Sequence, residues 1–160
     1  MKLSIERSAL LKAVSQAQSV VERRNTIPIL ANVLIEAEGE HVHFRATDLD
    51  IEILDKAVAQ VERAGATTVS AVMLHEIVRK LPDGSLVTLN DDPAKGRLSV
   101  EAGRSIFSLA TLPKEDFPIM ATSEYASNFS APAQLLRRLF DKSKFAISTE
   151  ETRYYLNGVY

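Results

Sequence analysis

Side chains that could bind a metal ion gather between residues 41 and 50. His41 and His43 are two positions apart, and Asp48 and Asp50 follow them closely. Imidazole nitrogens and carboxylate oxygens are the usual ligands of hydrolytic metal ions. Alternate residues of a strand share one face, so the two histidines would point the same way. A metal-dependent hydrolase is therefore one interpretation of this chain.

The neighbours of these histidines favour another interpretation. Glu38, Glu40 and Arg45 flank them, so we expect this strand face to point to solvent and not to form a metal site. His75 stands alone in a predicted helix and is expected at a surface or an interface. The sequence contains no cysteine, no Ser-His-Asp order, no glycine-rich phosphate loop and no His-Glu-x-x-His string. We predict a non-catalytic protein without a metal ion or a cofactor.

The composition is typical of a folded protein in water. Of the 160 residues, 46% are hydrophobic and 25% are charged. The longest apolar run, residues 71–74, is far shorter than the ~18 residues of a membrane span. Glu6 follows the first residues, where a signal peptide would continue into a longer apolar segment. We expect a cytoplasmic protein.

Three segments have apolar residues at helical spacing, and each follows a short extended segment. Ser70 is a plausible N-cap of the second helix, and Pro132 suits the first turn of the third. The residues expected to face inward are Leu10, Leu11, Val14, Ala17 and Val21 in the first helix, Leu74, Ile77, Val78 and Leu81 in the second, and Leu135, Leu136, Leu139 and Phe140 in the third.

Between the helices the hydrophobic period changes to two. Val42, Phe44 and Ala46 alternate with polar residues, which predicts half-buried antiparallel strands. The first 112 residues therefore show a helix followed by strands twice over, in an α+β fold. A shift of 125 residues places Asn32 on Asn157 and the first helix on the third, which indicates a domain-length repeat. We expect one domain over residues 1–122 and the start of a second, truncated domain over residues 123–160.

Charge is divided between the predicted helices and the predicted strands. The three helical segments, residues 7–24, 72–81 and 131–144, carry a net charge of +7, whereas the whole chain carries −2. Residues 36–62 alone hold eight acidic residues against two basic ones. The pattern suggests a helix-lined surface for phosphates on an acidic sheet, although solvated helix faces would show the same charges.

Several strings, in order and spacing, resemble the bacterial sliding clamp, the beta subunit of DNA polymerase III. The resemblance covers the whole chain. The most specific strings are Gly103-Arg104-Ser105-x-Phe107-Ser108-Leu109-x-Thr111-Leu112-Pro113, Asp116-Phe117-Pro118 and Arg153-Tyr154-Tyr155-Leu156-Asn157-Gly158, with Arg24-x-Thr26-Ile27-Pro28-Ile29-Leu30-x-Asn32 and Thr47-Asp48-Leu49 before them.

The resemblance implies a DNA-clamp fold, in which each domain packs two helices on antiparallel sheets with internal pseudo-two-fold symmetry. It also implies a ring-shaped homodimer that encircles duplex DNA without reading its sequence. Such a ring is a processivity factor, and it tethers DNA polymerase III, other polymerases and the clamp loader. Weak phosphate contacts suit that role, because tight base contacts would prevent sliding.

The resemblance also implies roles for individual residues. Those matching the DNA-facing surface of the family are Arg24, Arg79, Arg104, Arg137 and Arg138. Those at the edge of the pocket for partner peptides are Arg153, Tyr154 and Leu156, whose aromatic and leucine side chains suit such a pocket, whereas we expect Tyr155 in a core strand. Those at the joint between two subunits are Met73, Phe107 and Leu109.

Each role has a structural alternative. Arg104 could stabilise the turn that follows Gly103, and Glu150 departs from the family where an uncharged polar residue is frequent. Phe107 and Leu109 could be ordinary core residues of a strand. A metal-dependent hydrolase and a protein-interaction module remain the alternative functions.

Overall fold

The computed structural model describes residues 1–21, 26–120, 128–148 and 150–156. The chain divides into two compact units, Met1–Ala121 and Thr122–Tyr160, and the boundary expected near residue 122 lies outside the described residues. None of the helices in the described ranges is long and apolar enough to cross a membrane.

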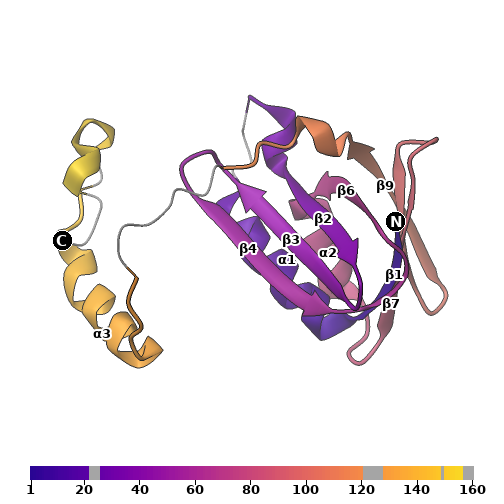
Figure 1. The fold of residues 1–160 in the computed structure, drawn as a ribbon, viewed down its shortest axis with the longest axis horizontal. Coiled ribbons are helices and arrows are strands. Elements are labelled where there is room, and N and C mark those ends of the chain that lie inside the picture. Colours follow the sequence, from indigo (N-terminus) through magenta and orange to yellow (C-terminus); the bar gives the residue numbers. More distant parts are fainter. Residues whose placement is uncertain (22–25, 121–127, 149, 157–160) are drawn as a thin grey trace. The chain divides into compact units, whose positions relative to one another are not determined.

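The first unit combines two helices with a large antiparallel sheet (Figure 1). The helices are α1 (Arg7–Val20) and α2 (Ala71–Lys80). The strands are β1 (Lys2–Glu6), β2 (Asn32–Glu38), β3 (His41–Thr47), β4 (Glu52–Val58), β5 (Gln60–Arg63), β6 (Gly65–Ser70), β7 (Leu86–Asp92), β8 (Arg97–Ala102) and β9 (Ser105–Leu112). Short 3-10 helices span Pro28–Ala31 and Lys114–Asp116.

The strand order shows that the unit is an internal repeat. The sheet runs β4-β3-β2-β6-β9-β8-β7-β1-β5, and every pairing is antiparallel. The halves β1-α1-β2-β3-β4 and β6-α2-β7-β8-β9 have the same element order. The first strand of each half pairs with the second strand of the other, β1 with β7 and β6 with β2. The predicted α+β fold with pseudo-two-fold symmetry is confirmed.

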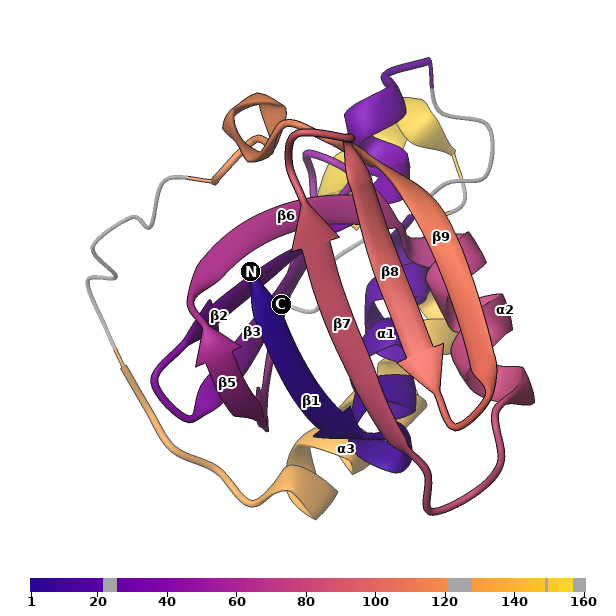
Figure 2. The ribbon, with the colours of Figure 1, turned by 90° about the vertical axis from the view of Figure 1, so that its right-hand side faces the viewer.

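These pairings create two groups of four strands, β4-β3-β2-β6 and β9-β8-β7-β1. Two further strand pairings connect the halves at the ends of these groups. The first is the short pairing of β6 with β9, where Thr68 lies opposite Leu112 and Val69 opposite Thr111. The second is made by β5, which continues from β4 after the buried residue Ala59 and pairs with β1. Figure 2 shows β5 beside β1 at the edge of the curved sheet. The strand pair β4 and β5 thus corresponds to the single strand β9.

Both helices pack on the same side of the curved sheet and contact each other (Figures 1 and 2). The apolar stripe of α1 is buried at Leu10, Val14 and Ala17, and that of α2 at Leu74 and Val78. The predicted inward residues of β3, Val42, Phe44 and Ala46, complete the same core. The sequence periods of 3.6 and two therefore identified the buried faces of these elements.

Side chains fix the first turn of each helix. The carboxylate of Glu6 accepts a hydrogen bond from the amide of Ala9 at 3.2 Å, and the hydroxyl of Ser70 accepts one from the amide of Met73 at 3.3 Å. Each bond satisfies an amide that has no partner within its own helix. The predicted N-cap role of Ser70 is confirmed.

The second unit contains α3 (Ala133–Ser143) and 3-10 turns at Lys144–Ala146 and Glu151–Leu156. None of its described residues is buried, so the expected inward packing of Leu135, Leu139 and Phe140 is not observed. The short extended segment expected before the third helix forms no strand, because residues 128–132 have no regular secondary structure. An amphipathic helix needs a facing element, and the described residues of this unit supply no sheet to cover it.

Candidate nucleic-acid interface

The basic residues of the two core helices have different environments. Arg79 is exposed in the last turn of α2, and its Nη2 donates to the carboxylate of Glu76 at 2.6 Å. This bond lowers the pKa of the Glu76 carboxyl, so the pair stays ionised at neutral pH. Lys12 and Lys80 are also exposed, and neither forms an ion pair with a described residue. Part of the positive charge of Arg79 is thus offset by a direct ion pair, whereas Lys12 and Lys80 form none with a described residue.

Arg7 contributes to the positive charge of α1 but has a structural role. Its side chain is mostly buried, and it donates to the carbonyl oxygens of Val78 and Arg79 at 3.1 and 2.9 Å. A third bond reaches the carboxylate of Asp83. These contacts occupy the guanidinium group, so it is not available to a phosphate.

Arg104 lies outside the helices. It follows Gly103, whose φ of 57° places the turn between β8 and β9 in the left-handed region. Its side chain is exposed and forms no ion pair with a described residue. Arg104 thus lies in a turn and Arg79 in a helix. The described residues show no ion pair through which Arg104 would stabilise the turn.

The remaining predicted phosphate contacts lie in other parts of the chain. Arg24 lies outside the described residues. Arg137 and Arg138 are exposed on α3, where Nε of Arg137 is 3.8 Å from the carboxylate of Asp141. Arg138 has no ion pair within the described ranges. The charge of Arg137 is thus partly offset by Asp141, whereas that of Arg138 is not paired with a described residue.

The residues expected at the edge of the peptide pocket lie in a 3-10 turn. Arg153 and Leu156 are exposed, and Nε of Arg153 is 2.8 Å from the carboxylate of Glu150. The side chain of Tyr154 is outside the described part of the structure. Tyr155 is exposed, so its expected place in a core strand is wrong. The turn has no partner strand among the described residues, and without one a core strand cannot form.

The predicted joint residues divide into exposed and buried positions. Met73 is 56% exposed in α2 and Phe107 is 37% exposed in β9, as an uncovered apolar joint requires. Leu109, in contrast, is 3% exposed and belongs to the core. The alternative of a core residue therefore holds for Leu109, which pairs with the buried Leu98 of β8.

Sequence reasoning did not single out Ile106, which is exposed beside Phe107. Its side chain is 71% exposed and lies on the other face of β9. The segment Ser105–Ala110 pairs only with β8, so its second edge has no strand partner in the described ranges. The sequence did contain an indication of this, because the alternation of a strand places Ile106 on the face opposite to Phe107 and Leu109.

The structure does not bring the four candidate metal ligands together. His41 and His43 lie along β3 opposite Glu38 and Glu36, whereas Asp48 lies in the turn after β3. The Asp48 carboxylate accepts hydrogen bonds from the amides of Asp50 and Ile51 at 2.9 and 2.7 Å. Among the described residues, no three His, Asp or Glu side chains form a metal-binding group. The described residues thus give no support to the metal-dependent hydrolase interpretation.

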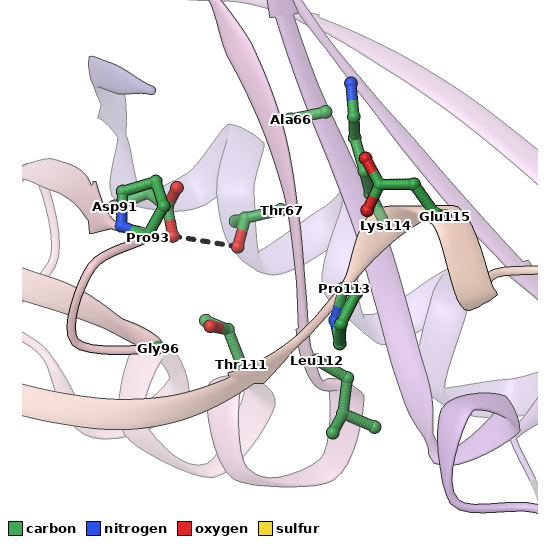
Figure 3. A pocket seen from close by; sticks show the side chains of 10 residues that line it. All are labelled: Ala66, Thr67, Asp91, Pro93, Gly96, Thr111, Leu112, Pro113, Lys114 and Glu115. Carbon is green, nitrogen blue, oxygen red and sulfur yellow. Dashed lines mark hydrogen bonds between the residues drawn. The ribbon is translucent and has the colours of Figure 1, made fainter.

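A pocket of about 380 Å³ lies where β6 meets β9 (Figure 3). On its wall, the hydroxyl of Thr67 donates to the buried carboxylate of Asp91 at 2.9 Å. The amino nitrogen of Met1 is 4.0 Å from the other carboxylate oxygen. Asp91 is therefore paired on both sides, and its contacts join β6, β7 and the residue that precedes β1. This arrangement supports packing between the halves.

Comparisons with known proteins agree with this geometry. A family model described as the DNA polymerase III beta subunit, N-terminal domain, matches residues 1–121. The beta sliding clamp of Caulobacter vibrioides is 57% identical over 163 residues, which cover 100% of this chain and 43% of the relative. That of Pseudomonas aeruginosa is 41% identical over 160 residues, which cover 99% of this chain and 43% of the relative.

Solved structures show the same likeness. A structure described as Caulobacter crescentus pol III beta has a TM-score of 0.93 at 58% identity, covering 100% of this chain and 43% of that one. A sliding clamp from Bartonella birtlesii bound to griselimycin has a TM-score of 0.94 at 48% identity, covering 100% of this chain and 42% of that one. The chain spans less than half the length of these relatives.

Proposed function

The chain belongs to the DNA polymerase III beta subunit family, and from this membership we propose that it forms part of a ring-shaped sliding clamp. The ring encircles duplex DNA and tethers DNA polymerase III, so it acts as a processivity factor. Other polymerases and the clamp loader are its further partners, and it works in the cytoplasm as a homodimer. The role is non-catalytic, since a ring that slides on DNA makes and breaks no covalent bond.

The observation that carries the proposal is the match to the beta subunit family over the complete internal repeat, residues 1–121. The distribution of charge supports it. Exposed bases, Lys12, Arg79 and Lys80, lie on helices that share one side of the sheet, whereas acidic residues concentrate in β2, in β4 and in the turns on either side of β3. A helix-lined positive surface attracts phosphates at long range without selecting a sequence.

Arg24, Arg137 and Arg138 complete the proposed phosphate-attracting set, with Arg104 at the turn between β8 and β9. Arg153, Tyr154 and Leu156 are proposed to form one edge of a pocket for partner peptides. The exposed side chains of Arg153 and Leu156 support this role, because a pocket edge must be reachable by the peptide. Met73 and Phe107, with Ile106 added, are proposed for the subunit joint.

A chimera tests the proposal in a complete ring. Residues 1–160 of this chain replace the matching segment of the Caulobacter vibrioides relative, and duplex affinity is measured across a salt series. Reversing Arg137 and Arg138 to glutamate should weaken binding and reduce the salt dependence by about one counterion per lost phosphate contact. Reversing Lys56, which lies in β4, is the control. Unchanged salt dependence in the double variant would remove both arginines from the DNA surface.

A further inference from the structure

A second hollow lies on the first unit. It is a groove of about 540 Å³ where β5 meets β1, close to the turn between β2 and β3. Residues of β1 and β5 form its walls, with Glu40 from the turn and Leu86 from the start of β7. Ala59 donates its amide to the carbonyl oxygen of Glu40 at 3.0 Å, which holds the turn against the junction of β4 and β5.

Apolar side chains in this groove are open to solvent. Val58, the last residue of β4, is 73% exposed, and Leu86, the first residue of β7, is 53% exposed although Val87 beside it is buried. Val61 is half-buried between them, and the buried side chain of Ile5 lies beneath. Large apolar side chains that line a hollow and remain uncovered are typical of a binding surface.

The charged residues of the groove are all acidic. They are Glu6, Glu40 and Glu62, and no lysine or arginine lines the groove. Glu6 caps α1, and Glu62 is 2.7 Å from Nζ of Lys2. The exposed side chain of Glu40 has no hydrogen bond or ion pair with a described residue. An apolar groove with a free carboxylate at its edge is complementary to an apolar side chain beside a cation.

The backbone favours an extended occupant over a compact one. β5 is the last strand of the sheet order and pairs only with β1 in the described ranges. A strand edge without a partner offers amides and carbonyls to an added extended segment.

We propose that this groove binds a short extended segment of a partner protein in which an apolar side chain is followed by lysine or arginine. The apolar side chain lies against Val58, Val61 and Leu86, and the cation lies beside Glu40. The site shares no residue with the proposed DNA surface or with the proposed pocket edge at Arg153, Tyr154 and Leu156. It does not depend on ring formation, so its test and the test of the clamp function can fail independently.

Amide NMR spectra of the 160-residue chain test the proposal with defined peptides. The probe is acetyl-Lys-Leu-Ile-Lys-amide, and the comparisons are the same peptide with glutamate at both ends and the same peptide with serine in the middle. We expect the probe to shift the amides of Gln60, Val61 and Leu86, and we expect the two comparison peptides not to do so. Equal shifts with free lysine amide would indicate a small-cation site and overturn the peptide proposal.

Two variants distinguish the groove from general charge attraction. Glu40→Lys should lower the affinity for the probe about 3- to 10-fold, which is the range of one or two exposed ion pairs. Asp50→Lys makes the same reversal of charge just beyond the opposite end of β3. It should change the logarithm of the affinity by less than half as much as Glu40→Lys does. Leu86→Ser should weaken binding without a change in charge. Equal effects of the two lysine variants, or shifts by the glutamate peptide, would show that the groove is not the site.

Discussion

The guanidinium group of Arg7 donates a hydrogen bond from Nε to the carbonyl oxygen of Val78 at 3.1 Å. Arg7 is the first residue of α1, and Val78 lies in the last turn of α2. Carbonyls at a helix end have no partner within the helix, so a cation from the other half of the repeat satisfies them. This contact joins the two halves through their helices, as β5 and β9 join them through their strands.

Replacement of Arg7 by alanine should therefore destabilise the first unit. It removes bonds to two helix-end carbonyls and to Asp83, and bonds from a charged group are worth roughly 1.5–3 kcal/mol. We expect the free energy of unfolding in urea to fall by roughly 2 kcal/mol. Lys12→Ala, on the exposed face of the same helix, should stay within about 0.5 kcal/mol of the parent. Equal losses in the two variants would contradict the capping role.

The hydrogen bond between Thr67 and Asp91 should make a separate contribution. Thr67→Val preserves the shape of the side chain but removes the donor, and the buried carboxylate loses a partner. A loss of about 1–3 kcal/mol is expected in the same urea experiment. Thr111→Val is the matched control, since its hydroxyl makes no hydrogen bond to a described residue. A neutral Thr67→Val variant would show that Asp91 is adequately paired without it.

The contact between Arg79 and Glu76 predicts a change in a pKa. The hydrogen bond from Arg79 is the main cause that lowers the pKa of Glu76, so Arg79→Ala should raise it. A carboxyl with a lowered pKa stabilises the fold above its unfolded pKa, and this contribution is lost as pH falls through the folded pKa. The variant should lose that acid-side dependence. Carboxyl carbon NMR titration of Glu76 checks the direction, and an unchanged pKa would contradict the assigned cause.

The faces of the strands and helices were predictable because burial follows local periods. Val42, Phe44 and Ala46 alternate at period two, and Leu10, Val14 and Ala17 recur at helical spacing. The closure of the sheet was not predictable, because β5 is short, polar and indistinguishable by pattern from the end of β4. Its pairing with β1 joins residues about 60 positions apart, and only the folded topology brings them together.

The candidate sites were predictable in part, for related physical reasons. Motif resemblance singled out Phe107, which is partly exposed, but it did not distinguish the buried Leu109 from the exposed Ile106. Alternation predicts the two faces of β9, but it does not predict which residues of the inward face are covered by the core. The ion pair of Arg79 with Glu76 was predictable, because Glu76 lies three residues earlier on the same helix.

The exposed residues of β9 predict the behaviour of the subunit joint. In the chimera, Ile106→Asp places a charge on the uncovered strand where an apolar contact is proposed. We expect the dimer dissociation constant to rise by more than about tenfold, measured by sedimentation. Leu86→Asp, at another exposed apolar position at the start of β7, should leave it within about twofold. A dimer insensitive to Ile106→Asp would place the joint elsewhere.

Retention on circular and linear DNA tests the central claim most directly. A ring held by topology remains on a closed circle and slides off once the DNA has ends, whereas a protein held by phosphate contacts binds both forms alike. The chimera is loaded onto a nicked circular plasmid, and half of the sample is linearised at one site before gel filtration in moderate salt. We predict that the chimera elutes with the circular DNA and separates from the linear DNA. Equal retention on both forms, or none on the circle after loading, would contradict the sliding-clamp function.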